Sequence, residues 1–205
     1  MDAAEQLAVE SGPAAVTVRS LSELTSVSNG AIYHAFGSRA GLMGRVWVRA
    51  ARAFLALQTN AVAAAFNSEN ASAVDAVVAA ADAPAQFLLD SPRSGRFLLV
   101  ASRNELLGSA DIPAEVADDL RSLDTSVTDM LIRLSEMTWG RADREAVAII
   151  KDCVVELPSA LLLRGERTPD PLVRERLAYA VRAVLKVPPP ERVSLSTESN
   201  DGPKE

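Results

Sequence analysis

Three hydroxyl residues, each standing directly before a run of helix-forming residues, constrain the N-terminal part of the chain more than any other feature. Thr17, Ser28 and Ser38 are N-cap residues by type and position, because a hydroxyl oxygen accepts hydrogen bonds from the free N–H groups of a first helical turn. Gly37 ends the second segment. Two short helices joined by a tight turn, with apolar residues at the joint, form a helix-turn-helix. The expected helices here cover 1–11, 17–24, 29–36 and 38–66.

The rest of the chain also has a helical pattern. Alanine, valine and leucine supply most of the 48% of hydrophobic residues, and aromatic residues make up only 4%. Few segments alternate with the two-residue period of a strand. We therefore expect an all-α fold, in which an N-terminal three-helix unit with a helix-turn-helix joins a larger helical domain. Further helices are expected from about 73, interrupted or kinked at Pro84, then after Pro92, and over 113–138, 143–163 and 171–186.

Composition shifts suggest where the domains divide. The polar segment NSENAS follows the long helix, and a proline run precedes a polar C-terminal segment of low apolar content. We expect a helix-turn-helix domain over 1–48, whose connecting helix runs to about 66. A larger helical domain is expected over 49–187 and a disordered tail over 188–205.

The net charge of −6 excludes a uniformly basic nucleic-acid-binding protein. The charge is uneven, however, since residues 1–52 carry five arginines against four acidic residues, or +1, and the remainder carries −7. The N-terminal residues carry acid where a secretory signal needs base, and no apolar run reaches the roughly 18 residues of a membrane span. A single cysteine fits a reducing compartment. These features predict a soluble, cytoplasmic protein that does not associate with membranes.

Catalytic chemistry has little support in the sequence. His34 and Cys153 are the single histidine and the single cysteine, and no metal-ligand cluster, P-loop or dinucleotide fingerprint accompanies them. Cys153 is expected to be a small buried residue, and Asp118 and Asp119 to lie on a solvated helix face. We therefore expect no enzyme activity, no cofactor and no metal ion.

A longer motif includes the capped helices. It consists of Thr17-Val18-Arg19, the Val27-Ser28-x-Gly30 step, the Ile32-Tyr33-x-x-Phe36 run, Ser38-Arg39 and Leu42. Over about residues 3–46 this motif resembles the N-terminal signature of the TetR family of bacterial transcriptional regulators. The resemblance implies a homodimer with a DNA-reading helix on each subunit. It further implies that the domain over 1–48 binds DNA and that the domain over 49–187 binds a ligand and dimerises. The protein would then be a repressor of operator DNA that a small-molecule effector, bound in the larger domain, releases.

The predicted DNA contacts follow from helix-turn-helix geometry, in which the second helix presents its N-terminal residues to base edges in the major groove. An asparagine there can pair with adenine, and an alanine can meet a thymine methyl. Tyr33 and His34 can donate to phosphates, although Tyr33 could instead belong to the core and His34 could be an ordinary exposed residue. Ile32 and Phe36 are expected to pack the core. The predicted DNA-binding residues are Thr17, Arg19, Ser28, Asn29, Gly30, Ala31, Tyr33, His34 and Arg39.

The body offers candidates for an effector pocket and a dimer interface. Pockets in helical domains lie between the middle helices, although the apolar candidates could equally be ordinary core residues. The last two long helices carry more apolar residues than one buried face needs, which suggests a four-helix interface between two copies. The candidate pocket residues are Phe87, Phe97, Arg103, Met130, Leu134 and Trp139. The candidate interface residues are Ile149, Val154, Leu157, Leu161, Leu177, Val181 and Val184.

Some residues depart from the family pattern. The family usually has a basic stretch and another helical turn before the position of Met1, so either the start lies upstream or some phosphate contacts are missing. Thr25 and Ser26 replace the usual Ala-Gly in the turn, and a left-handed Ser26 would cost on the order of 1 kcal/mol relative to glycine. These departures favour an alternative, a TetR-like helical ligand-binding or protein-interaction dimer that no longer binds DNA. An all-helical enzyme is disfavoured.

Overall fold

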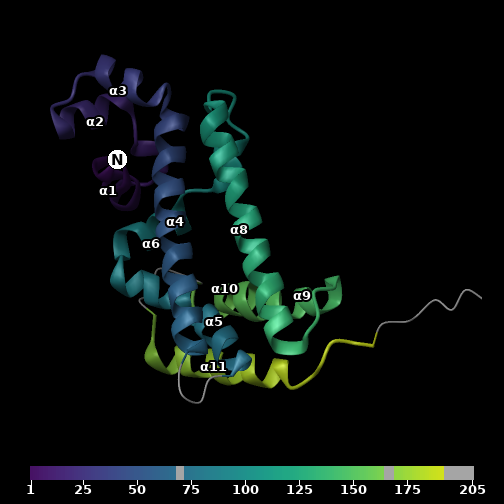
Figure 1. The fold of residues 1–205 in the computed structure, drawn as a ribbon. Coiled ribbons are helices and arrows are strands. Elements are labelled where there is room, and N and C mark those ends of the chain that lie inside the picture. The colour runs from purple at the N-terminus through teal and green to yellow at the C-terminus, as the bar shows by residue number, and fades with distance from the viewer. Residues whose placement is uncertain (68–71, 164–168, 192–205) are drawn as a thin grey trace, which may run out of the picture.

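The computed structural model describes residues 1–67, 72–163 and 169–191, and these residues form helices with no strand among them (Figure 1). The predicted all-α fold is confirmed. The helices are α1 (Asp2–Ser11), η1 (Pro13–Ala15), α2 (Val18–Thr25), α3 (Asn29–Phe36), α4 (Arg39–Phe66), α5 (Ala73–Asp90), α6 (Pro92–Val100), α7 (Arg103–Leu107), α8 (Ala114–Trp139), α9 (Arg144–Lys151), η2 (Asp152–Glu156), α10 (Leu157–Leu161) and α11 (Pro171–Leu185).

The first three helices lie together on one side of the N-terminal half of α4 and form with it a unit that we call the head (1–48; Figure 1). Its core contains Leu21 of α2, Ile32 of α3 and Leu42 and Val46 of α4, all buried. Phe97 of α6 is fully buried in the same cluster. The head therefore packs against α6 and continues through α4 into the rest of the chain.

The two long helices α4 and α8 run side by side from the head into the body, which we define as residues 49–187 (Figure 1). Near their N-termini they approach closely, since a Cβ atom on Gly41 would lie 2.9 Å from the Pro113 side chain. Two ion pairs cross this contact, Arg45 with Glu115 and, further along, Arg52 with Asp119 at 2.7 Å. Helix α8 is thereby fixed to the segment that connects head and body.

The core of the body brings together helices that are far apart in the sequence. Ala80 and Ala81 of α5, Leu134 of α8, Ile150 of α9 and Leu177 of α11 are all buried in one cluster. The small alanines of α5 let the surrounding helices approach it closely, and α11 contacts α5 along much of its length. Burial of this continuous apolar cluster is the main stabilising contribution expected in the body.

Helix α5 continues through Pro84 as one helix, so the expected interruption is wrong. Proline has no N–H group, and the carbonyl four residues earlier, that of Ala80, loses its usual helical partner. Gln58 of α4 donates its Nε2–H group to the Ala80 carbonyl oxygen at 2.9 Å. Gln58 is only 3% exposed, so this bond is buried. A hydrogen bond between two helices therefore replaces the one that proline removes.

The single helix predicted over 143–163 is divided into three parts. Between α9 and α10, the π-helix η2 is closed by the Leu157 N–H group bonding to the Asp152 carbonyl five residues earlier. Pro158 follows immediately and cannot donate to the carbonyl four residues before it. The π-turn thus lies where proline prevents the regular pattern. The short helix α7 was not predicted, because its five residues are too few to show a period.

The predicted tail over 188–205 falls in two parts. Residues 192–205 lie outside the described residues. Residues 188–191 have no regular structure, yet they lie against the body, with Pro189 buried. Arg141 donates to the Pro190 carbonyl at 2.8 Å and pairs with Asp143 at 2.6 Å. Residues 188–190 are prolines, and the Arg141 side chain binds the carbonyls of Pro189 and Pro190, so the structure places them against the body.

Candidate nucleic-acid interface

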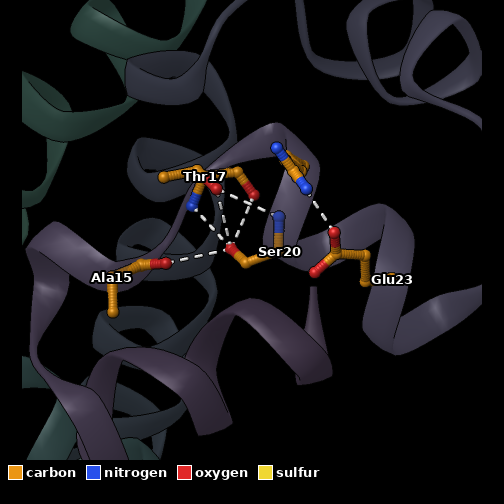
Figure 2. A network of polar contacts seen from close by, with 5 residues as sticks. Ala15, Thr17, Ser20 and Glu23 are labelled. Atoms are coloured by element: carbon orange, nitrogen blue, oxygen red, sulfur yellow. Dashed lines mark hydrogen bonds and ion pairs between the residues drawn. The ribbon is translucent and has the colours of Figure 1, made fainter.

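Helix α2 begins with a complete set of capping bonds. The Ser20 N–H group donates to Thr17 Oγ1 at 3.0 Å, and the Thr17 N–H group donates to Ser20 Oγ at 2.9 Å. The Ser20 hydroxyl donates in turn to the Ala15 carbonyl at 2.9 Å, so Ser20 links the cap to the preceding turn (Figure 2). Thr17 is exposed, and the predicted N-cap is confirmed. These bonds fix the direction in which α2 leaves the α1–α2 turn.

The turn between α2 and α3 contains the one non-glycine residue with a positive φ among the described residues. Ser26 has φ 57° and ψ 19°, the left-handed conformation considered from the sequence. Thr25 Oγ1 donates to the Leu21 carbonyl at 2.6 Å and so closes the last turn of α2. Ser28 then caps α3 by accepting from the Ala31 N–H group at 3.2 Å. The sharp change of chain direction is therefore held by hydroxyl groups on both sides of a strained residue.

Replacing Ser26 by glycine is expected to raise the free energy of unfolding by about 0.5–1 kcal/mol. Relief of the left-handed strain outweighs the added entropy of the unfolded chain. Urea denaturation followed by circular dichroism would measure the change, with Ser26→Ala as the control, because alanine keeps the strain and should give no gain. Equal stability of the glycine and alanine variants would contradict the assignment of strain to this residue.

Helix α3 exposes the residues predicted to contact DNA. Asn29, Gly30, Ala31 and His34 are exposed, and the Tyr33 residue is 54% exposed. The alternative that Tyr33 belongs to the core is therefore wrong. Ile32 and Phe36 point inward, with Ile32 buried and Phe36 half-buried against the head core, as expected. One face of α3 holds the helix in the head and the opposite face carries groups able to meet base edges and phosphates.

The arginines of the head mostly make contacts within the chain. Arg39 donates its Nε–H group to the Val16 carbonyl at 2.5 Å and also bonds to the Pro13 carbonyl, so it joins α4 to the α1–α2 turn. To contact a phosphate, as predicted, Arg39 would have to exchange these hydrogen bonds to carbonyls for bonds to phosphate oxygens. Arg19 has a side chain 86% exposed, and its one ion pair among the described residues is with Glu23, one helical turn away, at 3.0 Å. Arg19 is thus the arginine of the head best placed to meet a phosphate.

A cavity of about 300 Å³ lies in the body between α4, α5, α6, α8 and the η2–α10 segment. Phe54 and Phe87 form part of its wall, with their rings in an edge-to-face arrangement at a centroid distance of 5.6 Å. The polar side chains in the wall are Gln58 and, at an exposed edge, Ser159. Its size is at the lower limit for a small-molecule site.

Two of the six predicted pocket residues, Phe87 and Met130, line this cavity. Phe97 is buried in the head core, and Leu134 and Trp139 pack in the body core. Arg103 donates to the Leu120 carbonyl at 3.0 Å and pairs with Asp124. These four do not line the cavity. Gln58 was not predicted as a pocket residue. The sequence feature that could have indicated it is an isolated amide on the apolar side of the long helix.

The predicted interface residues differ in their exposure. Val154, Leu177 and Val181 are buried in the core of the chain itself. Their side chains therefore stabilise the body and are not available to a second copy. Of the remaining four candidates, Leu161 is exposed, and Ile149, Leu157 and Val184 are half-buried.

Comparisons with known proteins agree with this architecture. Residues 1–46 match the family model described as bacterial regulatory proteins, tetR family. A bacterial regulatory protein in the tetR family from Rhodococcus RHA1 is 19% identical, with a TM-score of 0.64 over 93% of this chain and 95% of that one. The TetR family transcriptional regulator PfmR from Thermus thermophilus is 18% identical, with a TM-score of 0.65 over 93% and 98%. The chain has the fold of a TetR-family transcriptional regulator.

A third solved structure with this TetR fold is the ketosteroid transcriptional regulator KstR2 of Mycobacterium tuberculosis. It is 14% identical, with a TM-score of 0.56 over 93% of each chain. No curated protein sequence matches the chain. The resemblance to the TetR family, predicted from the motif of the head, is confirmed, and the similarity of the body establishes the fold alone.

Three further features were sought among the described residues: a metal site, a reactive cysteine and a helix long and apolar enough to cross a membrane. Within residues 1–67, 72–163 and 169–191, no group of three or more histidine, cysteine, aspartate or glutamate side chains could hold a metal ion. Burial, with a smaller contribution from Asp152, raises the pKa of the Cys153 thiol to about 11, so its reactive thiolate form is scarce. Over the same residues, no helix has both the length and the apolar character needed to cross a bilayer.

Proposed function

We propose that the chain is a ligand-responsive transcriptional repressor that binds operator DNA as a homodimer. The observation that carries this proposal is the exposed N-terminal face of α3, with Asn29, Gly30 and Ala31 presented to solvent while Ile32 fixes the helix in the head. A recognition helix of a helix-turn-helix enters the major groove in this way. The protein acts in the cytoplasm and has no enzymatic role in this proposal.

A dimer is supported by the exposed apolar surface of the last helices. Leu161 of α10 and Leu172 and Tyr179 of α11 are 44%, 60% and 67% exposed. Large apolar side chains gathered on neighbouring helices commonly mark contacts between protein chains. A two-fold dimer formed through α10 and α11 would bring two heads to one DNA duplex, with half-sites about one or more helical turns apart.

Release by an effector would act through the separation of the two heads. The cavity lies beside α4, which continues without interruption into the head. A ligand that binds one separation of the heads more tightly than another shifts the population toward that state. DNA affinity falls if the favoured separation no longer fits the half-sites.

A second candidate function is a ligand-binding dimer that does not bind DNA. The observation that favours it is the engagement of arginines within the chain. Arg39 bonds to backbone carbonyls, and Arg45, Arg49 and Arg52 pair with carboxylates. Fewer free cations weaken phosphate binding.

Fluorescence-anisotropy binding to the DNA just upstream of the protein's own coding region would separate the two functions. The proposal expects specific binding that weakens as salt increases and is lost in Tyr33→Ala and Asn29→Ala. Tyr33→Phe serves as the control, because it removes only the hydroxyl and isolates the contribution of one phosphate hydrogen bond. Absence of specific binding at low salt would favour the dimer that does not bind DNA.

The Arg19→Ala variant should reduce the dependence of DNA affinity on salt, because each phosphate contact releases condensed counterions. The slope of log K against log salt is expected to fall by about one for each phosphate that Arg19 neutralises. Arg121→Ala is the matched control, since Arg121 of α8 is also exposed and also pairs with a neighbouring carboxylate on its own helix. The slope for Arg121→Ala should equal that of the wild type. Equal effects of the two variants would place the electrostatic contact elsewhere than at α2.

A further inference from the structure

The cavity in the body has a wall without ionisable groups. Among the described residues that line it, the side chains are aliphatic, aromatic, proline or glycine, with only Gln58 and Ser159 polar. An ionised ligand transferred from water into such a wall loses its hydration without gaining a counter-charge. The composition of the wall therefore excludes anionic and cationic ligands more strongly than neutral ones.

Gln58 is the polar group that the interior of this wall offers. Its residue is 3% exposed, and its Nε2–H group is committed to the Ala80 carbonyl at 2.9 Å. Its Oε1 oxygen has no hydrogen-bond partner among the described residues, although it is an acceptor with two lone pairs. Gln58 lines the cavity, and because the bond to Ala80 fixes its amide, the remaining acceptor is held in one orientation. An acceptor held in this way favours a ligand that carries a hydrogen-bond donor.

Ser159 does not fill the same role. Its hydroxyl donates to the Val155 carbonyl at 2.6 Å, within its own helical segment, and the residue is exposed. Water competes for a group at such an edge, so its contribution to selectivity is small. Recognition of a polar atom inside the cavity therefore depends on Gln58.

We propose that the cavity binds a neutral, largely apolar small molecule carrying one hydrogen-bond donor, which the Gln58 Oε1 oxygen accepts. The inference rests on the proposed function only in taking this cavity as the effector site. It adds the class of ligand, which is uncharged and carries a hydrogen-bond donor, and the residue that recognises this donor. The bond between Gln58 and Ala80 positions the acceptor, and it is made to the carbonyl that Pro84 leaves without its usual helical donor.

Two fluorescent probes that share one skeleton test the exclusion of charge. Phenyl-naphthylamine is neutral and has one N–H donor, whereas anilinonaphthalene sulfonate adds a sulfonate to the same ring system. The full chain is expected to bind the neutral probe about tenfold or more tightly than the anionic one. Equal affinities, or no binding of the neutral probe at high micromolar concentrations, would overturn the inference.

The location of the probe is tested on α8. Met130→Trp fills the cavity and should abolish binding of the neutral probe, whereas Ser126→Trp, one turn away at an exposed position, should retain it. Leu99→Trp, at an exposed rim of the cavity, repeats the test with less disturbance of packing. Wild-type affinity in both cavity variants would show that the probe binds elsewhere and would overturn the inference.

The role of Gln58 is tested by the N-methyl derivative of the neutral probe, which lacks the donor. The comparison uses Pro84→Ala and the double variant Pro84→Ala with Gln58→Met, because an alanine at position 84 supplies an N–H group for the Ala80 carbonyl in both. The Ala80 carbonyl oxygen has two lone pairs, so in the single variant it can accept from this N–H group and still hold the Gln58 amide. A preference of about fivefold for the N–H probe is expected where Gln58 is present. The preference should disappear in the double variant. An unchanged preference would show that Gln58 is not the acceptor.

The same titrations distinguish this inference from the proposed function. Binding of the neutral probe with unchanged DNA affinity would leave the ligand class standing and contradict release of DNA by an effector. Loss of DNA affinity without the expected probe selectivity would support a ligand-responsive regulator and overturn the ligand class.

Discussion

Replacing Gly41 by alanine is expected to lower the free energy of unfolding by about 2–3 kcal/mol, a typical cost of forcing an extra methyl group into a filled contact. The added Cβ atom would overlap the Phe36 carbonyl oxygen at the end of α3 and would lie 2.9 Å from the Pro113 Cγ atom. A backbone oxygen cannot move aside as a flexible side chain can, so α3 or α4 must shift. Urea denaturation at a fixed protomer concentration would measure the effect.

Gly30→Ala is the matched control for this prediction. Nothing lies within 4 Å of a Cβ atom on Gly30, which is in a helix and exposed. Alanine there should raise the free energy of unfolding by about 0.5 kcal/mol, because it is the better helix former. The two substitutions are thus expected to differ in sign. Destabilisation by Gly30→Ala, or tolerance of Gly41→Ala, would contradict the close approach of α3, α4 and α8 described here.

Gln58→Met is expected to cost about 1–3 kcal/mol of stability. Methionine fills a similar volume but cannot donate, and the Ala80 carbonyl is left buried without its interhelical partner. Gln6→Met provides the comparison, since Gln6 donates to Glu10 at an exposed site. Loss of a hydrogen bond there should change stability by no more than about 0.5 kcal/mol.

The cause of this cost can be tested by restoring the helical donor. In a Pro84→Ala background, the new N–H group at position 84 can bond to the Ala80 carbonyl in the ordinary way. The cost of Gln58→Met should therefore be smaller there, with a coupling free energy of about 1–2 kcal/mol in the double-mutant cycle. Additive effects would show that Gln58 stabilises the body by packing alone.

The head could be predicted from the sequence because its signals are local. Thr17, Ser28 and Ser38 each mark a helix start within a few residues, and the structure caps a helix with each of them. The side of α3 that faces outward also followed from the apolar character of Ile32 and Phe36. Arg39 was predicted less well, because a positive charge in the sequence does not reveal a neighbouring carbonyl contributed by residues more than twenty positions earlier.

The body was harder to predict because its relevant contacts lie between distant segments. A run of apolar residues marks a buried face but does not tell a core residue from a cavity residue, so Leu134 and Met130 looked alike. Pro84 was expected to interrupt or kink its helix, and the compensating amide bonds to a carbonyl 22 positions away in another helix. The same holds for the interface candidates Leu177 and Val181, which are buried in one cluster with residues of α5.

The internal pairing of arginines has a consequence for how such a protein would find its target in a cell. Arg39, Arg45, Arg49 and Arg52 are held by carbonyls and carboxylates, so within residues 1–52 few cations remain to attract the phosphates of arbitrary DNA. A chromosome offers about a million or more competing sites. A regulator that adheres weakly to those sites stays largely unbound between encounters, and a small number of copies then suffices to keep one operator occupied.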